Sequence, residues 1–232
     1  MKTLIILHGW QSSKERWERI KNEIEKEEIA VIIPDLPGFK KETELDETWN
    51  FNDYLEWLYN FSLNKERFFL LGHSFGGRIA IRFTVKYPSK IKGLILVGSA
   101  GIKPKKNIFL SIFVPIFKKF SFLPGYSLFR EFFYKYILKK TDYLEAKGIM
   151  RETFKKIIKE DLRPYLSQIK TPTLIIWGQK DKITPLSDAY LMKEKIKDSK
   201  LEILENVGHT PHLEAPEKLS KIISGFLAKT ST

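Results

Sequence analysis

The stretch that decides the fold of this chain is "FLLGHSFGG", residues 69–77. An apolar run ends there in a serine that lies between two glycines, and an amphipathic helical pattern starts at Gly76. Gly72, Ser74 and Gly76 form a Gly-x-Ser-x-Gly motif between a strand and a helix, where the serine adopts a strained turn. The glycines lack side chains that would collide where the backbone passes close to itself. The pattern predicts that the Ser74 hydroxyl is exposed beyond the carboxyl end of a buried strand.

On both sides of this segment, short runs rich in Ile, Leu and Val alternate with longer amphipathic stretches. The alternation is typical of βα units around a parallel sheet whose strands are buried on both faces. The expected strands are Thr3–Leu7, Ala30–Ile33, Phe68–Leu71, Gly93–Val97, Thr173–Trp177 and Leu201–Leu204. The expected helices are Lys14–Glu27, Asn52–Phe61, Gly76–Tyr87, Leu186–Ile196 and Glu217–Ala228. The sequence therefore predicts an α/β fold with a six-stranded parallel sheet.

The alternation of strand and helix patterns is interrupted once, in a basic and aromatic segment that shows no strand pattern. We expect residues 102–165 to form a helical cap, or lid, inserted between two strands, with "LPGYS" at 123–127 as a turn between its helices. The core is then made of residues 1–101 and 166–232. One domain with an insertion is consistent with the chain length of 232 residues.

Composition excludes several classes of protein. Hydrophobic residues make up 43% and aromatic residues 13% of the chain, which is too much for a disordered protein. No apolar stretch reaches the roughly 18 residues that a membrane-spanning helix needs. The chain has no cysteine, so disulfides, thiolate nucleophiles and cysteine metal ligands are excluded. The N-terminal "MKTLIILHGW" lacks a signal-peptide cleavage pattern and is interpreted as the first strand, so we expect a cytoplasmic protein.

The net charge of +12 is concentrated in the predicted cap. Residues 102–165 contain 15 Lys or Arg and 6 Asp or Glu, which leaves a charge of only +3 for the rest of the chain. Two interpretations stay open: a lid with solvated lysines, or a basic amphipathic surface that docks on a membrane or on an acidic acyl-carrier protein. Nucleic-acid binding is not expected, because the known motifs are missing, and no metal-ligand spacing is found.

A serine hydroxyl needs a base to take its proton and a third group to orient that base. The chain has four histidines, of which His8 and His73 lie in glycine motifs and are expected to shape their loops. His209 follows the last predicted strand, in "NVGHTPHLEAPE", and would lie at the carboxyl ends of the strands. His212 is expected to point elsewhere. His209 is therefore the predicted base.

The predicted acid is Asp181, which follows a strand in "LIIWGQKDKITP". Its carboxylate would accept the imidazole Nδ1 proton and stabilise the imidazolium. Asp35 is interpreted as a turn cap and Asp188 as a surface or capping residue of a helix.

A tetrahedral oxyanion requires preorganised N–H donors. One predicted donor is the backbone N–H of Phe75, which follows Ser74 at the positive end of a helix. The second is the N–H of Trp10 in "LHGW", where Gly9 lets the backbone approach. Trp10 also has the position of a residue that lines the pocket.

The stretches "LHGW", "GHSFGG", "WGQKD" and "GHTPHLEAPE", in this order, together resemble the α/β-hydrolase superfamily. The segment "IIPDLPGF", residues 32–39, is similar to the usual strand-to-loop passage of that family. Its usual fold opens with two further strands before the strand that carries "HG". The resemblance therefore implies an α/β-hydrolase fold trimmed to six parallel strands in the order 2-1-3-4-5-6, with flanking helices and an inserted cap.

The resemblance implies a serine hydrolase that cleaves small-molecule carboxylic esters of apolar acyl groups and needs no cofactor. "HGW" with "PDLPGF" resembles carboxylesterases that cut the methyl ester of an acyl group on acyl carrier protein. "GSAGI", residues 98–102, resembles carbon–carbon bond hydrolases of ring-cleavage products. Three alternatives stay open: carbon–carbon hydrolysis, a non-catalytic ligand-binding protein of the same fold, and a structural turn at Ser74 in an inactive relative.

Overall fold

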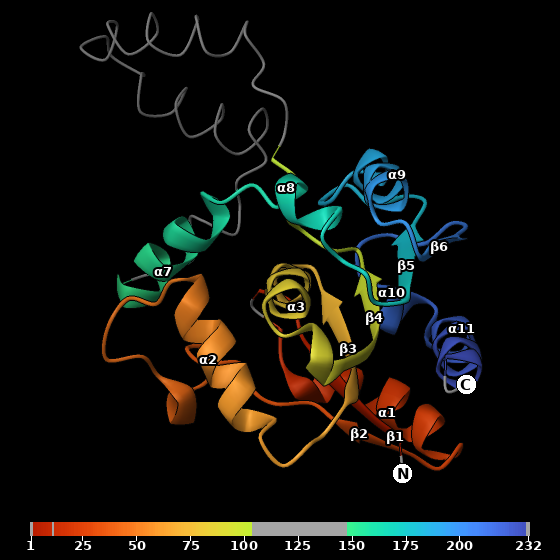
Figure 1. Cartoon of the computed structure of the whole chain (residues 1–232), viewed down its shortest axis with the longest axis horizontal. Helices are drawn as coiled ribbons and strands as arrows, with labels where there is room; N and C mark the ends of the chain where they lie inside the picture. Colours follow the sequence, from red (N-terminus) through yellow and green to blue (C-terminus); the bar gives the residue numbers. More distant parts are fainter. Residues whose placement is uncertain (1, 11, 104–147, 231–232) are drawn as a thin grey trace, which may run out of the picture.

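The computed structural model describes residues 2–10, 12–103 and 148–230 of the chain (Figure 1). Within these residues, six parallel strands form one sheet in the order β2-β1-β3-β4-β5-β6. The predicted fold class, strand number and strand order are confirmed. The strands are β1 (Lys2–Leu7), β2 (Ile29–Ile32), β3 (Phe68–His73), β4 (Ile91–Val97), β5 (Thr173–Gly178) and β6 (Ser199–Leu204).

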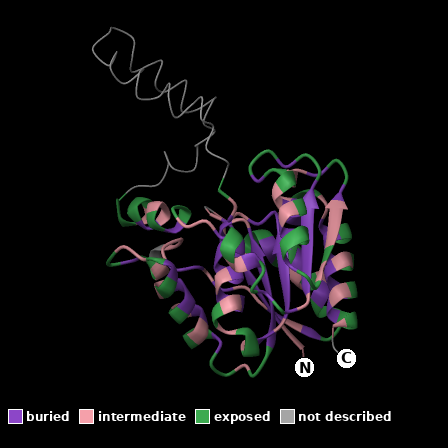
Figure 2. Cartoon of the chain, turned by 45° about the horizontal axis from the view of Figure 1, so that its top comes forward, coloured by how far each residue is buried: buried purple, intermediate pink, exposed green. Residues whose placement is uncertain are grey.

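Alternate side chains of each central strand enter two different cores. In β1, Ile5 and Leu7 belong to one hydrophobic cluster, whereas Leu4 and Ile6 belong to the other. This follows from the two-residue period of a strand, which directs successive side chains to opposite faces of the sheet. Figure 2 shows the strands as a buried layer between helices whose outer sides are exposed. A sheet covered on both faces explains why its strands read as continuous apolar runs.

The helices form a layer on each face of the sheet (Figure 1). α1 (Glu18–Glu25) and α11 (Pro216–Lys229) pack on one face. The helices that contribute to the core on the other face are α2 (Phe51–Phe61), α3 (Phe75–Lys86), α7 (Gly148–Ile158), α8 (Arg163–Leu166) and α9 (Leu186–Lys195). Short helical turns are η1 (Lys14–Trp17), η2 (Lys41–Thr43), η3 (Pro88–Lys90) and α10 (Pro211–Glu214).

All five helix predictions differ from the structure at one or both ends. α3 begins and ends one residue before the expected Gly76–Tyr87, α9 ends one residue before the expected Ile196, and α11 extends one residue beyond each end of the expected Glu217–Ala228. The helix expected over Lys14–Glu27 is a 3-10 turn followed by α1, which ends at Glu25. α2 begins one residue earlier than expected because Asn50 caps it: its Oδ1 accepts a hydrogen bond from the Asn52 N–H at 2.7 Å. The Asn50 N–H in turn donates to the Asp53 carboxylate at 2.6 Å, which completes a capping box.

The predicted cap lies largely outside the described residues. These include only 102–103 and 148–165 of it, so the turn at 123–127 and the basic aromatic surface expected to meet a membrane or an acidic carrier are not among them. Where the chain is described again, α7 lies beside α2 (Figure 1), and the Thr153 hydroxyl accepts a hydrogen bond from the Trp49 N–H at 3.0 Å.

Arg78 of α3 attaches this returning segment to the core. Its guanidinium donates to the carbonyl oxygens of Ile157 at 2.8 Å and Glu160 at 2.5 Å. Burial lowers the pKa of Arg78 to about 10, so the side chain keeps its charge at neutral pH. A buried cation at the end of α7 satisfies carbonyl groups that have no partner within the helix.

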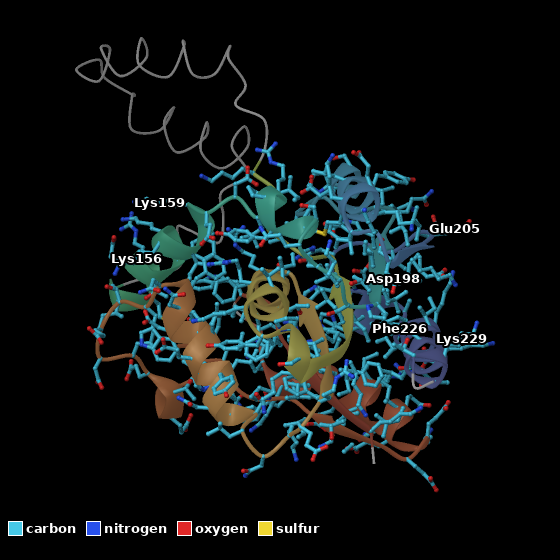
Figure 3. The ribbon with its side chains drawn as sticks, viewed as in Figure 1. Lys156, Lys159, Asp198, Glu205, Phe226 and Lys229 are labelled. Carbon is cyan, nitrogen blue, oxygen red and sulfur yellow. The ribbon has the colours of Figure 1, made fainter. Side chains whose placement is uncertain are left out.

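Figure 3 labels Lys156 on α7 and Lys159 directly after it, far from Phe226 and Lys229 on α11. Lys156 donates to the Thr48 hydroxyl at 2.7 Å, so it also links α7 to the loop before α2. In the described part of the chain, no helix combines the length and the apolar character needed to cross a membrane.

Candidate active site

Ser74 lies in the sharp turn between β3 and α3. Its backbone has φ 50° and ψ −112°, a conformation that an L-residue adopts only when its surroundings enforce it. A Cβ on Gly72 would lie 2.5 Å from the Gly76 carbonyl oxygen, and a Cβ on Gly76 would lie 2.2 Å from that of Leu7. Both positions therefore require glycine. The turn leaves Ser74 partly exposed at the carboxyl edge of the sheet.

The structure brings Ser74, His209 and Asp181 together. The Nε2 atom of His209 lies 3.0 Å from the Ser74 Oγ, and its Nδ1 lies 2.8 Å from the Asp181 Oδ2. With the imidazole proton on Nδ1, this nitrogen donates a hydrogen bond to the carboxylate, and Nε2 accepts a hydrogen bond from the serine hydroxyl. His209 follows β6 and Asp181 follows β5, so both side chains reach the edge where β3 delivers Ser74.

The carboxylate of Asp181 is buried and fully hydrogen-bonded. Its Oδ1 accepts from the backbone N–H groups of Ile183 at 2.8 Å and Thr184 at 2.9 Å. Its Oδ2 accepts from the Thr184 hydroxyl at 2.8 Å in addition to His209. Burial alone would raise the pKa of Asp181, but the bonds from His209 and Thr184 outweigh it and hold the pKa below its usual value. Asp181 is therefore ionised at neutral pH.

His73 and His8 support the neighbouring loops. The Nε2–H of His73 donates to the carbonyl oxygen of His209 at 2.9 Å, and burial holds the pKa of His73 well below its usual value. The His8 Nε2 accepts from the Leu36 N–H at 3.2 Å, which leaves the ring proton on Nδ1, 2.9 Å from the Gly9 carbonyl oxygen. Both rings are neutral, because burial lowers their pKa values. His73 connects the end of β3 to the loop after β6, and His8 connects the loop after β1 to the loop after β2.

His212 points away from Ser74, as the sequence predicts. Its ring stacks on Trp17 with centroids 4.2 Å apart and planes 7° apart. Neither ring nitrogen has a hydrogen-bond partner among the described residues. Burial lowers the pKa of His212 to about 3, so the ring is neutral and serves as an aromatic packing group.

The two other acidic candidates have different surroundings. Asp35, expected to cap a turn, forms ion pairs with Lys14 at 2.9 Å and Lys40 at 3.1 Å, and so joins the loops after β1 and β2. Asp188 lies in the first turn of α9, as expected. Burial raises the pKa of Asp188 to about 6, although the charge of Arg163 acts in the opposite direction.

The loop after β1 lies against Ser74. A Cβ on Gly9 would be 3.3 Å from the Cβ of Ser74 and 2.9 Å from the Nδ1 of His73, so only glycine allows this approach. Trp10 follows directly, and Phe75 is the first residue of α3. The two residues expected to supply N–H donors therefore come from segments on either side of Ser74, and their rings meet with centroids 5.2 Å apart.

The Trp10 ring is the centre of an aromatic wall made of Trp10, Phe39, Phe75 and Phe154. The centroid of Trp10 lies 4.9 Å from that of Phe39 and 4.3 Å from that of Phe154. Sequence reasoning missed Phe154, which lies on α7 within the predicted cap and has no local signal. It also missed Thr184. The Asp-x-x-Thr spacing after β5 is a usable signal for it, because an aspartate carboxylate can accept hydrogen bonds from the backbone amides two and three residues further along the chain.

No cluster of three or more His, Asp or Glu that could hold a metal occurs among the described residues.

Comparison with known proteins agrees with this architecture. A family model described as alpha/beta hydrolase fold matches residues 2–123 and 146–216. A pimeloyl-[acyl-carrier protein] methyl ester esterase of Wigglesworthia glossinidia brevipalpis is 30% identical over 97% of this chain and 93% of its own length. A monoacylglycerol lipase of Homo sapiens is 28% identical over 97% of this chain and 75% of its own length.

Solved structures show the same fold. A thermophilic esterase from Thermogutta terrifontis superposes with a TM-score of 0.76 at 23% identity, over 100% of this chain and 91% of the other. At this identity the likeness concerns the fold alone. The family match covers most of the chain, and the curated relatives include lipases and esterases. This chain belongs to the α/β-hydrolase fold family.

Proposed function

We propose that this chain is a serine hydrolase that cleaves carboxylic esters of apolar acyl groups. Ser74 is the nucleophile, His209 is the general base and acid, and Asp181 orients His209. The observation that carries the proposal is the continuous hydrogen-bond chain from the Ser74 Oγ through His209, at 3.0 Å, to Asp181, at 2.8 Å. The positive φ of Ser74 supports it, because backbone strain at an exposed serine is typical of a nucleophile turn.

The reaction proceeds in two halves. The Ser74 Oγ attacks the ester carbonyl carbon while its proton passes to the Nε2 of His209, and the backbone N–H groups of Phe75 and Trp10 stabilise the oxyanion. The bond to the alcohol oxygen then breaks, and His209 returns the proton to the leaving alcohol. In the second half, water loses a proton to His209 and attacks the acyl-enzyme, and Ser74 leaves with that proton.

The preference for an apolar acyl group is supported by the aromatic wall beside Ser74. Trp10, Phe39 and Phe154 keep part of their apolar ring surface exposed, and the buried Phe75 ring packs against Trp10 and Phe39. The charged groups of Asp35 and Lys40 are engaged with each other in an ion pair at 3.1 Å. The two named relatives also fit, since one is a methyl ester esterase and the other a monoacylglycerol lipase.

The test uses the purified chain with p-nitrophenyl esters of graded acyl length and a fluorophosphonate probe that labels activated serines. We expect turnover of these esters, and Ser74→Ala should lose about 10⁴-fold or more in kcat and all labelling. The control is Ser187→Ala, which removes an exposed hydroxyl on α9 and should leave both properties unchanged.

Turnover by Ser74→Ala at the wild-type rate would refute the nucleophile. Wild-type protein that is labelled but releases product only over hours would indicate a ligand-binding protein. Faster turnover of a vinylogous diketone than of any ester would assign the chain to carbon–carbon hydrolysis.

A further inference from the structure

A fourth side chain contacts both Asp181 and His209. The Oγ1 atom of Thr184 lies 2.8 Å from the Asp181 Oδ2 and 3.3 Å from the His209 Nδ1. The same hydroxyl lies 3.2 Å from the carbonyl oxygen of Gly98, at the end of β4. Thr184 is only 6% exposed, so no bulk water competes for these bonds.

The hydroxyl has one proton and two acceptors within reach. Its shorter contact, 2.8 Å against 3.2 Å, is with the Asp181 Oδ2, so it donates to the carboxylate and not to Gly98. A lone pair of Oγ1 then faces the Nδ1–H of His209. The carboxylate oxygen that receives the imidazole proton is thus fixed from a second direction, by a charge-assisted hydrogen bond.

We propose that Thr184 is a positioning residue of the catalytic triad, which holds the Asp181 Oδ2 in line with the His209 Nδ1 and moderates its negative charge. The inference rests on the proposed function. Because a hydroxyl bond to the carboxylate offsets part of its charge, removal of the bond leaves more charge to stabilise the imidazolium. His209 then holds its proton more firmly and returns it to the leaving alcohol less readily.

The fold of the loop does not depend on this hydroxyl. The Thr184 carbonyl oxygen accepts from the Nε1–H of Trp177 at 2.9 Å, and its backbone N–H donates to the Asp181 Oδ1. Trp177 is fully buried in the core. Valine has nearly the shape of threonine, so Thr184→Val keeps the backbone anchors and removes only the hydroxyl. The substitution therefore separates positioning from folding.

Other ionisable groups surround the pair. His73 at the end of β3 and His212 of α10 have pKa values lowered by burial and are neutral. The carboxylates of Asp188 on α9 and Glu214 on α10 also interact with the charge of Asp181. The pKa of Asp188, about 6, lies within the range of an activity profile. The pH profiles are therefore measured both in the wild-type and in the Asp188→Asn background.

The experiment compares Thr184→Val with Thr184→Ser in the full chain, using ethyl butyrate, whose leaving alcohol needs a proton from His209, between pH 5 and 9. Thr184→Val should lower kcat by about 10-fold, as the loss of an orienting hydrogen bond does elsewhere, with KM changed less than twofold. The acidic limb of its kcat/KM profile should move to higher pH in both backgrounds. Thr184→Ser, which restores the hydroxyl, should recover wild-type kcat within about twofold.

Thr184→Val with wild-type kcat and an unmoved acidic limb would overturn the inference, and so would a serine variant as slow as the valine variant. In either case, wild-type turnover and loss of labelling in Ser74→Ala would leave the proposed function intact. If Ser74→Ala keeps its activity, the proposed function is refuted, independently of the results for the Thr184 variants. Thermal denaturation of both Thr184 variants checks that each is folded.

Discussion

The two sides of Ser74 are held by different forces. On one side, Asp181 and His209 are connected by hydrogen bonds to Thr184, His73 and each other, at 2.8 to 2.9 Å. On the other side is the aromatic wall around Trp10, where rings meet with centroids 4.3 to 5.2 Å apart. The polar side is directional and the aromatic side is a packed surface.

This difference assigns separate tasks to the two sides. Hydrogen bonds lose their strength over tenths of an ångström and a few tens of degrees, so they suit groups that transfer a proton. Aromatic packing depends mainly on buried area and tolerates several shapes, so it suits recognition of an acyl chain. Substitutions on the polar side should change kcat, and substitutions on the aromatic side should change the preference among acyl lengths.

The largest expected effect is on the polar side. Asp181→Asn should lower kcat by about 10³- to 10⁴-fold, because an amide at this position favours the wrong tautomer of His209. Steady-state kinetics with p-nitrophenyl butyrate measures the loss. Asp188→Asn is the matched control, since in the described part of the chain the carboxylate that hydrogen-bonds to His209 is that of Asp181 and not that of Asp188. Equal losses in the two variants would show that the acid has been misassigned.

A smaller effect is expected on the aromatic side. Phe154→Ala removes the ring that packs 4.3 Å from Trp10 and leaves space beside it. The ratio of kcat/KM for the p-nitrophenyl octanoate to that for the acetate should rise about three- to tenfold, with kcat for the acetate nearly unchanged. Phe61→Ala, at an exposed position on α2, is the control. An unchanged ratio, or a collapse of kcat on the acetate, would remove the distinction between the two sides.

The smallest effect concerns His212, which is three residues from His209 but packs as an aromatic ring. Its pKa is about 3 when folded and 6.5 ordinarily, so below pH 6.5 the unfolded chain binds a proton that the folded chain does not. Stability should therefore fall on acidification from pH 6.5, by about 1 kcal/mol per pH unit for such a group. His73 acts in the same direction.

Thermal denaturation between pH 7.5 and 5 tests this linkage. His212→Phe keeps the stacking on Trp17 and removes one titrating ring, so its Tm should fall less steeply with pH than that of the wild type. Asp188 titrates in both proteins alike and cancels in the comparison. Parallel curves would contradict a neutral buried ring, and a large loss of ester hydrolysis in this variant would place His212 in the catalytic machinery.

Most of the sheet is predictable because its signals are local. Strands that are buried on both faces read as continuous apolar runs, and each predicted strand lies within two residues of its observed ends. α10 was not predicted, because a helix of four residues is too short to show a hydrophobic periodicity in the sequence. The ion pairs of Asp35 could not be predicted from the sequence, because its partners lie in separate segments, Lys14 in η1 and Lys40 in the loop after β2, and no local pattern brings them together.

The sequence by itself determined the order of the βα units and the position of a glycine-flanked serine after a buried strand, because these depend on neighbours in the chain. Only the tertiary structure decided which polar groups meet. Ser74 and His209 are 135 residues apart, and they come within 3.0 Å because parallel strands deliver their carboxyl ends to one edge of the sheet. The Thr184 hydroxyl and the Phe154 ring join them for the same reason: contacts between distant segments form when the core packs.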